Sequence, residues 1–413
     1  MRREVTGYNK IRSKRVLAVA LLVINSLTWL YMMRKILQNN LNHIYPADSL
    51  QLNLIFWGIF NFAIIGSSII ATLLSNRVQR PVIFYIWIPL GIFASILIYY
   101  LPNLGFFHIL IIFCLSGISF GLGMPECLAY FAEETDFLTR GTIGGLIFFL
   151  TNLLTPLILA FSTNFILAVI SIVIWRALVF LLFPLIFPKE SVFKKRKEVP
   201  YKLVIFDRRF LLYFIPWLMF SLIYSFQRVV IERNLSADFV NLLTIIAAIS
   251  GTISAFFAGI LCGQFGRKRI IILGFVSLGI AYGIIGVSPS NWLFPFYLYG
   301  IVGGAAWGIL LLMFVLVLWG DLSETSMNSP QKYYALGSLP FFLSDSLGFL
   351  FSLYILIPVN EAFSVASFFL FLAVVPLMYA PETLPEKVIR EKELKKYIEK
   401  AKKIREKYEK EKD

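Results

Sequence analysis

A single carboxylate stands inside an apolar stretch toward the C-terminal end of the chain. Asp345 lies roughly ten residues into the run 334–357, whose other residues are mostly apolar or small. An ionisable group among apolar helices is costly to bury, so such a group is a functional candidate by default. A desolvated carboxyl suits reversible proton binding, and we predict a proton-coupling or solute-binding role for Asp345. The alternative is a structural carboxylate that pairs with serine or backbone groups.

Glu126 and two arginines are the next candidates. Glu126 lies near one end of an apolar run, where it either titrates or forms an ion pair with Arg80 or Arg140. Arg34 and Arg228 each lie toward the end of another apolar run. They could attract an anionic solute, or their long side chains could reach out to a polar interface.

Three amide side chains occupy the middle of apolar runs. Asn25, Asn61 and Asn152 could hydrogen-bond a polar solute. Alternatively they hold helices together, a contact that contributes about 0.6–2 kcal/mol. Further candidates for solute contacts are Trp29, Tyr224, Gln227 and Trp307, although single residues of these types more often serve packing.

These polar residues are exceptions in a strongly apolar chain. Of the 413 residues, 58% are hydrophobic and 15% are charged, whereas about a quarter of a soluble domain is charged. Apolar runs of about 20 residues, the length that crosses a bilayer, recur along the whole sequence. Backbone in hydrocarbon must satisfy its own hydrogen bonds, so each run is predicted to be a helix.

The predicted fold is an all-α integral membrane protein with twelve transmembrane helices in two pseudo-symmetric bundles of six. The spans are expected at 15–37, 51–75, 81–101, 105–131, 139–161, 164–187, 210–231, 239–262, 269–287, 293–319, 334–357 and 361–380. An even number of spans puts both termini on one side. With the termini inside, the inner segments hold all of the 38 lysines and arginines except Arg34, Lys35, Arg176, Arg228 and Arg233, as the positive-inside rule requires.

Charge also divides the chain into four parts. A six-helix bundle at 1–187 is followed by a basic cytoplasmic linker at 188–209, a second bundle at 210–380 and a charged, helical tail at 381–413. Since the basic residues border spans, the net charge of +14 indicates contact with membrane lipids rather than with nucleic acid. The cell membrane is the expected location, with both termini cytoplasmic.

Sequence landmarks recur in the two halves at a nearly constant spacing. The stretch that begins at Ala71 and ends at Arg80 follows the second span, and a similar stretch from Gly259 to Lys268 follows the eighth, 188 positions later. Such an offset is typical of an internal duplication, which in secondary transporters places the binding site between the repeats.

Three of these landmarks resemble motifs of the major facilitator superfamily of transporters. Gly259, Gly266, Arg267 and Lys268 match its loop signature, roughly G-x-x-x-D-R-x-G-R-R, although Gly263 replaces the acid. In the first half Ser75 replaces the acid and Arg80 remains. The stretch 132–145, with Arg140-Gly, is similar to the junction of spans four and five, and Pro381-Glu-Thr resembles the end of the sugar-porter-like branch.

The resemblance implies a function as well as a fold. It implies that the spans carrying Asp345, the three amides and Trp307 line a central cavity, and that Arg34 and Arg228 face each other at its mouth. Arg80, Arg140, Gly259, Gly266, Arg267 and Lys268 would belong to the inner gate. Without the loop acids, that gate must depend on other contacts.

We therefore expect a secondary active transporter that moves a small organic solute, a sugar or an organic acid, by alternating access with proton coupling. The alternatives are efflux of amphipathic compounds and a transporter-like receptor or scaffold. The sequence has no spacing typical of a metal site, a phosphate-binding loop or an intramembrane protease. We expect no enzyme, no cofactor and no metal, and a monomer.

Overall fold

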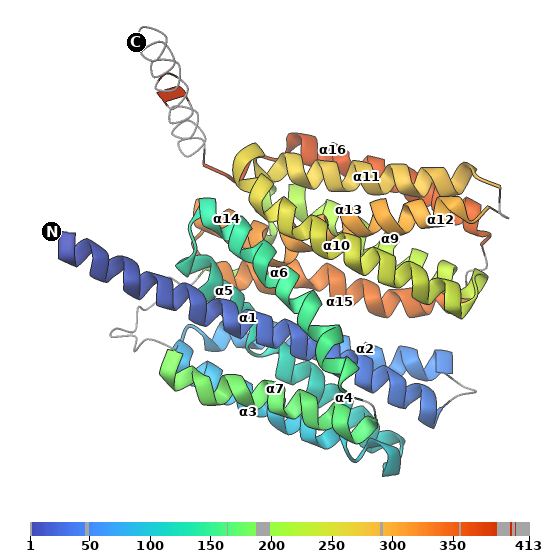
Figure 1. The fold of residues 1–413 in the computed structure, drawn as a ribbon, viewed down its shortest axis with the longest axis horizontal. Helices are drawn as coiled ribbons and strands as arrows, with labels where there is room; N and C mark the ends of the chain where they lie inside the picture. The colour runs from blue at the N-terminus through green and yellow to red at the C-terminus, as the bar shows by residue number, and fades with distance from the viewer. Residues whose placement is uncertain are drawn as a thin grey trace, which may run out of the picture.

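Long helices that run side by side make up nearly all of the protein (Figure 1). The computed structural model describes residues 2–45, 49–162, 164–186, 199–289, 292–354, 357–385, 397–398 and 401. Eleven helices in this part of the chain are long and apolar enough to cross a membrane. With the 25-residue α15, which packs between α2 and α9, there are twelve long segments. The chain is a multi-pass, all-helical membrane protein.

The N-terminal half contains the first six spans, of which the fourth is broken. Its helices are α1 (Arg2–Ile44), α2 (Ser49–Leu74), α3 (Arg80–Ile98), α4 (Phe106–Gly121), α5 (Met124–Glu134), α6 (Phe137–Ala160) and α7 (Phe165–Ile186), with a short 3₁₀ turn η1 (Leu101–Asn103). Residues 187–198, which include half of the predicted linker, lie outside the described residues.

The C-terminal half repeats this arrangement. It contains α8 (Tyr201–Ile205), α9 (Arg208–Asn234), α10 (Ala237–Phe265), α11 (Arg267–Val287), α12 (Phe294–Leu298), η2 (Tyr299–Gly303), α13 (Gly304–Leu311), η3 (Leu312–Val317), α14 (Leu318–Thr325), α15 (Pro330–Tyr354) and α16 (Val359–Tyr379). The segments from α12 to α14 form one span, in which η2 and η3 are π-helical. Of the predicted charged tail, only a few residues are described.

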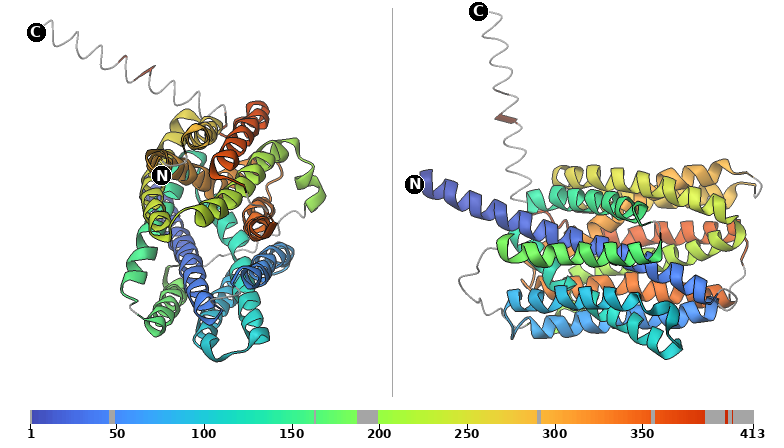
Figure 2. Two further views of the ribbon diagram at one scale, coloured as in Figure 1. Left: turned by 90° about the vertical axis from the view of Figure 1, so that its right-hand side faces the viewer. Right: turned by 60° about the horizontal axis from the view of Figure 1, so that its bottom comes forward.

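The two halves form two bundles that meet along one seam. Seen end-on, the bundles lie one above the other (Figure 2). Across the seam, α2, α5 and α6 of the first half contact α10, α14 and α15 of the second. We call the end of the bundles where α1 begins and α16 ends the termini end, and the other the loop end (Figure 1).

Local sequence explains where the helices begin and break. The fourth span breaks at Gly121–Gly123 because Pro125, at the start of α5, has no N–H to donate to the preceding turn. A Cβ on Gly123 would also overlap the ring of Trp87. At the start of α6, Asp136 and Thr139 form a capping box, which satisfies two backbone N–H groups that have no helical partner.

Candidate functional site

Asp345 lies at the centre of a polar cluster that joins the two halves. Its carboxylate accepts hydrogen bonds from Arg34 at 2.6 Å and Arg228 at 3.1 Å. Asn61 donates to the same carboxylate at 3.0 Å and to Ser346 at 3.2 Å. Arg34 and Asn61 belong to the first half, whereas Arg228, Asp345 and Ser346 belong to the second. We call these five residues the Asp345 cluster.

Aromatic packing positions the arginine that crosses the seam. The guanidinium of Arg34 lies 4.7 Å from the ring centre of Trp57 and 5.7 Å from that of Phe60. The indole of Trp57 donates to Gln38 at 2.7 Å, which fixes the ring. A cation held over an aromatic face is stabilised by the ring quadrupole, so α1 and α2 present Arg34 toward Asp345.

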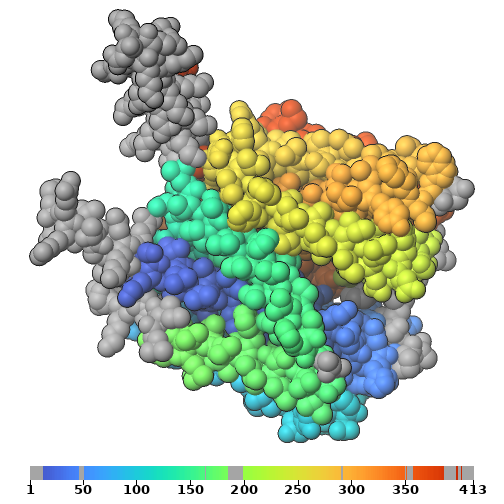
Figure 3. Space-filling view, in the orientation of Figure 1, coloured from blue at the N-terminus to red at the C-terminus, as the bar shows by residue number. Residues whose placement is uncertain are grey.

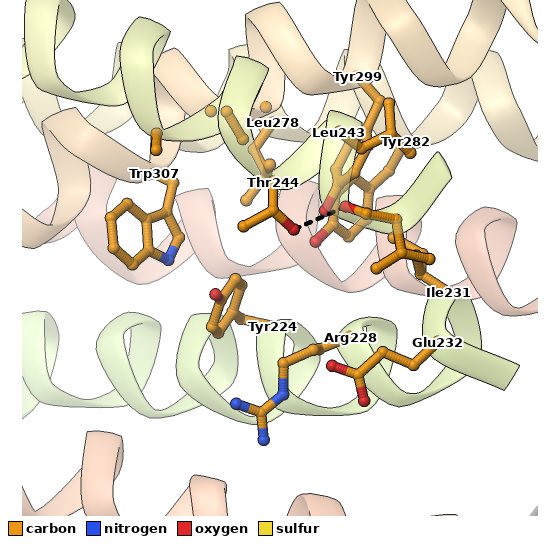
Figure 4. Close-up of a pocket in the computed structure, with 15 residues that line it drawn as sticks. Tyr224, Arg228, Ile231, Glu232, Leu243, Thr244, Leu278, Tyr282, Tyr299 and Trp307 are labelled. Atoms are coloured by element: carbon orange, nitrogen blue, oxygen red, sulfur yellow. Dashed lines mark hydrogen bonds between the residues drawn. The ribbon is translucent and has the colours of Figure 1, made fainter. Parts of the chain in front are cut away.

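A cavity of about 290 Å³ lies on the second-half side of the Asp345 cluster. It is enclosed by α9, α10, α11 and the η2–α13 segment, and Arg228 belongs both to its wall and to the cluster. Its other walls are mainly apolar and aromatic (Figure 4). They are formed by Tyr224, Ile231, Glu232, Val240, Leu243, Thr244, Ala247, Ala248, Leu278, Tyr282, Tyr299, Gly303, Gly304 and Trp307. We call this space the Tyr224 cavity.

A second polar cluster joins the halves at the termini end. Asp321, in the middle of α14, accepts hydrogen bonds from both Arg140 and Arg267, the latter at 2.8 Å. All three side chains are fully buried. Arg140 also contacts Glu324 at 2.9 Å, and Arg267 donates to the carbonyl of Phe137. These residues, the Asp321 cluster, connect α6 to α11 and α14.

The first half contains a related ion pair. Arg80, at the start of α3, contacts Glu126 at 2.7 Å and Glu133 at 2.8 Å. Glu126 therefore has the ion pair that the sequence suggested as an alternative to proton coupling. Arg80 and Glu133 correspond to Arg267 and Asp321 at offsets of 187 and 188 positions, so both halves carry the same pair.

Gly266 and the Pro381-Glu-Thr motif form one structure at the start of α11. Gly266 has φ 93°, a backbone conformation that suits glycine alone. The carboxylate of Glu382 accepts from the backbone N–H of Arg267 at 2.8 Å and of Lys268 at 3.2 Å. A carboxylate is stabilised at the N-terminus of a helix by the unpaired N–H groups and the helix dipole. The motif thus fixes the position of α11.

Glycines allow α6 and α10 to touch across the seam. A Cβ on Gly259 would lie 3.0 Å from the Cα of Gly145, and a Cβ on Gly141 would lie 2.7 Å from the carbonyl oxygen of Gly259. Side chains there would push the halves apart. On the face drawn in Figure 3, the halves are in contact near the termini and a hollow opens between them toward the loop end.

Bulky side chains fill the seam between the two clusters. They leave a cavity of only about 80 Å³, bordered by residues of both halves such as Leu27, Tyr31, Phe120, Trp217 and Phe342. The Tyr224 cavity is therefore separated from the termini end by packed side chains and by the Asp321 cluster.

Several predicted solute contacts are bonded within one half, either to a neighbouring helix or to their own helix. Asn25 donates to the carbonyl of Trp175 at 2.6 Å, and Trp29 donates to Ser95 at 2.8 Å. Gln227 donates to the carbonyl of Ala362. Asn152 donates to its own helix at the carbonyl of Phe148. Trp307 does border the Tyr224 cavity.

The amides Asn25, Asn61 and Asn152 therefore have separate partners, and among the described residues no hydrogen bond joins any two of them. Buried Arg176 stacks on Trp87 at 4.4 Å and donates to Asn25 at 2.9 Å. These contacts join α7 to α3 and to α1.

Asp321 and Glu232 are not among the site residues predicted from the sequence. The tenth span was expected to end at residue 319, but its last helix continues to Thr325. The helix continues because Asp321 is neutralised by arginines of both halves. The offset of 188 positions between the two halves, added to Glu133, leads to Asp321 and could have identified it from the sequence. Among the described residues, no group of His, Cys, Asp and Glu could hold a metal ion.

No protein-family model matches the sequence, and no curated protein matches it. Solved structures of transporters share its fold. The human organic anion transporter MFSD10 superposes with a TM-score of 0.68 at 15% identity, covering 89% of this chain and 99% of that one. A bacterial homologue of the iron transporter ferroportin, in an outward-facing state, gives 0.66 at 16% identity, covering 89% and 98%. The E. coli fucose:proton symporter FucP gives 0.69 at 11% identity, covering 89% and 98%. This multi-pass membrane protein has the fold of the major facilitator superfamily.

Proposed function

We propose that the chain is a secondary active transporter that moves a small organic solute across the cell membrane by alternating access. The observation that carries the proposal is the pair of polar clusters, the Asp345 cluster and the Asp321 cluster, which join the halves at two positions along the seam. Alternating access requires contacts between the halves that break and re-form around a fixed site. Ion pairs that cross between two rigid bundles suit this requirement, because each pair has a discrete bonded and separated state.

The Tyr224 cavity is the proposed solute site. It lies next to the Asp345 cluster, and its volume of about 290 Å³ is at the lower end of the range of ligand pockets, about 300–1,000 Å³. In the proposed cycle the Asp321 cluster closes the termini end, which we take as cytoplasmic, while solute enters from the loop end.

Proton coupling through Asp345 is part of the proposal. Two guanidiniums favour the charged form of the bonded carboxylate, so a proton would bind once the halves separate and would then keep Arg34 from re-forming its ion pair. The named solutes of the similar structures are diverse, namely an organic anion, iron and fucose. The fold therefore leaves both sugars and organic acids open as solutes. Efflux of amphipathic compounds is the second candidate, supported by the apolar walls of the cavity.

Uptake by proteoliposomes tests this proposal. Labelled sugars, organic acids and amino acids are supplied with and without an inward proton gradient, for the wild type and Asp345→Asn. We expect the gradient to drive accumulation in the wild type and the variant to lose that drive. Asp238→Asn, which removes an exposed carboxylate at the start of α10, is the matched control and should behave as wild type.

Two results would count against parts of the proposal. Unchanged gradient-driven accumulation in Asp345→Asn would remove Asp345 as the coupling residue but leave the transporter assignment. No flux of any tested solute in either direction, including export of amphipathic dyes, would contradict transport itself.

A further inference from the structure

Two opposite charges line the Tyr224 cavity on adjacent turns of one helix. Arg228 and Glu232 are four residues apart on α9, and their side chains extend next to each other along the cavity (Figure 4). Residues at this spacing have Cβ atoms about 5–6 Å apart. A solute in the cavity therefore meets a cation and an anion within the reach of one small molecule.

The charges around the cavity balance. Arg228 is joined through Asp345 to Arg34, so the Asp345 cluster holds two guanidinium groups and one carboxylate. Glu232 adds a second carboxylate. A bound anion would face two existing carboxylates, and a bound cation would face two existing guanidiniums. A solute with both charges and no net charge matches the site best, because like charges close together are costly.

The remaining walls determine which uncharged part of a solute fits the cavity. Tyr224 and Trp307 lie with ring centres 5.8 Å apart, and Tyr282 and Tyr299 with ring centres 5.5 Å apart. Leucine and alanine side chains fill the spaces between them. Among the described residues, no asparagine or glutamine lines the cavity. A sugar needs many hydrogen bonds to replace those it makes with water, and these walls offer chiefly the hydroxyls of Thr244 and three tyrosines.

We infer that the solute is zwitterionic: its carboxylate binds Arg228, its ammonium group binds Glu232, and its apolar or aromatic body lies against Trp307 and the tyrosines. An amino acid with an apolar or aromatic side chain has this chemistry and this size. This inference rests on the proposed function, since it names the solute class of the proposed transport site.

The inference also gives Asp345 a second role. The solute carboxylate and Asp345 share Arg228 as a ligand. Binding of the solute draws Arg228 toward the cavity and weakens its bond to Asp345, so that Asp345 is held mainly by Arg34 and Asn61 of the first half. Solute binding would thereby change a contact between the halves.

Binding to the purified full-length protein in detergent tests the charge assignment by calorimetry. The probes are matched sets built on leucine, phenylalanine and tryptophan: the amino acid, its N-acetyl form (an anion) and its carboxamide (a cation). Glucose serves as a neutral polyol. We expect the wild type to prefer the free amino acid of at least one set over both modified forms by about tenfold, the effect of losing one charged hydrogen bond.

Two charge variants make the inference specific. Glu232→Gln should lower the affinity for the free amino acid to that for its N-acetyl form. Arg228→Gln should lower the affinity for the free amino acid to that for its carboxamide. The matched controls are Arg233→Gln and Asp238→Asn, whose side chains are exposed and do not line the cavity, and neither should change the order of the probes.

The outcomes separate this inference from the proposed function. Preferred binding of an anion, a cation or glucose, or binding of none of the probes, would overturn the zwitterion assignment. Transport of another solute in liposomes would still support the transporter. Binding with the expected charge pattern but with no exchange of labelled amino acid across liposomes would keep the site and contradict transport.

Discussion

The carboxylate of Asp321 pairs with two buried arginines, Arg140 and Arg267. Without this carboxylate, two positive charges would be buried next to each other. Arg140 and Arg267 are fully buried, and each approaches one oxygen of Asp321. Glu324 also contacts Arg140, but its side chain is about half exposed, at 48%. A buried ion pair adds little net stability, whereas removal of one partner is costly because the other charge stays buried.

We expect Asp321→Asn to destabilise the protein by about 3–5 kcal/mol, the usual effect of breaking a buried ion pair. Glu324→Gln removes a carboxylate that water still solvates and should cost at most about 1 kcal/mol. Thermal unfolding in detergent, followed by circular dichroism, measures both. Equal losses of Tm for the two variants would contradict the central place of Asp321.

The contact between α6 and α10 determines how closely the halves approach at the termini end. Gly141, Gly145 and Gly259 bring the two backbones together, as small residues do between membrane helices. Cys262 is buried beside this contact, so its thiol reports whether the seam is closed.

We expect Gly259→Val to separate α6 from α10 and to expose Cys262. In a background with Cys114 and Cys127 replaced by alanine, alkylation of Cys262 by a small thiol reagent should become at least several times faster. Gly66→Val is the control, because a Cβ at Gly66 meets nothing within 4 Å. If Cys262 reacts no faster in Gly259→Val than in this control, the glycines do not hold the seam closed.

The arrangement of the whole molecule follows from an even number of spans and an uneven distribution of basic residues. The start of α1 and the end of α16 lie at the same end of the bundles (Figure 1). The charged clusters of Arg80, Arg140 and Arg267 lie at that end too. We expect this end to face the cytoplasm, by the positive-inside rule.

Fusions of a reporter enzyme that is active only outside the cytoplasm test this orientation. A fusion truncated after Asn103, at the loop end between α3 and α4, should be active. Fusions at the C-terminus and after Lys197, between the two halves, should be inactive. Activity of the C-terminal fusion would reverse the orientation, and with it the side on which the Asp321 cluster closes the protein.

The apolar runs of the sequence predict the number of spans and the fold, and the structure and the structures similar to it confirm both. This was possible because a span depends on a continuous apolar run and on backbone hydrogen bonds made within that run. The sequence also indicates Asp345, Arg34, Arg228 and Asn61 as candidates, because each is a polar residue in an apolar run and can be recognised without knowledge of its partner. Their roles in binding or coupling stay predictions.

Which of these residues meet depends on how the helices pack, and the sequence does not show this. Asp345 bonds Arg34 across the seam over 311 positions of sequence, whereas the amides of Asn25 and Gln227 bond to residues of their own halves. The side of the helix that faces the seam decides this outcome, and an all-round apolar helix carries no periodic signal of its facing side. For the same reason the sequence predicts that the tenth span ends at residue 319. In the structure the helix continues through Asp321, whose carboxylate is neutralised by arginines from two other helices.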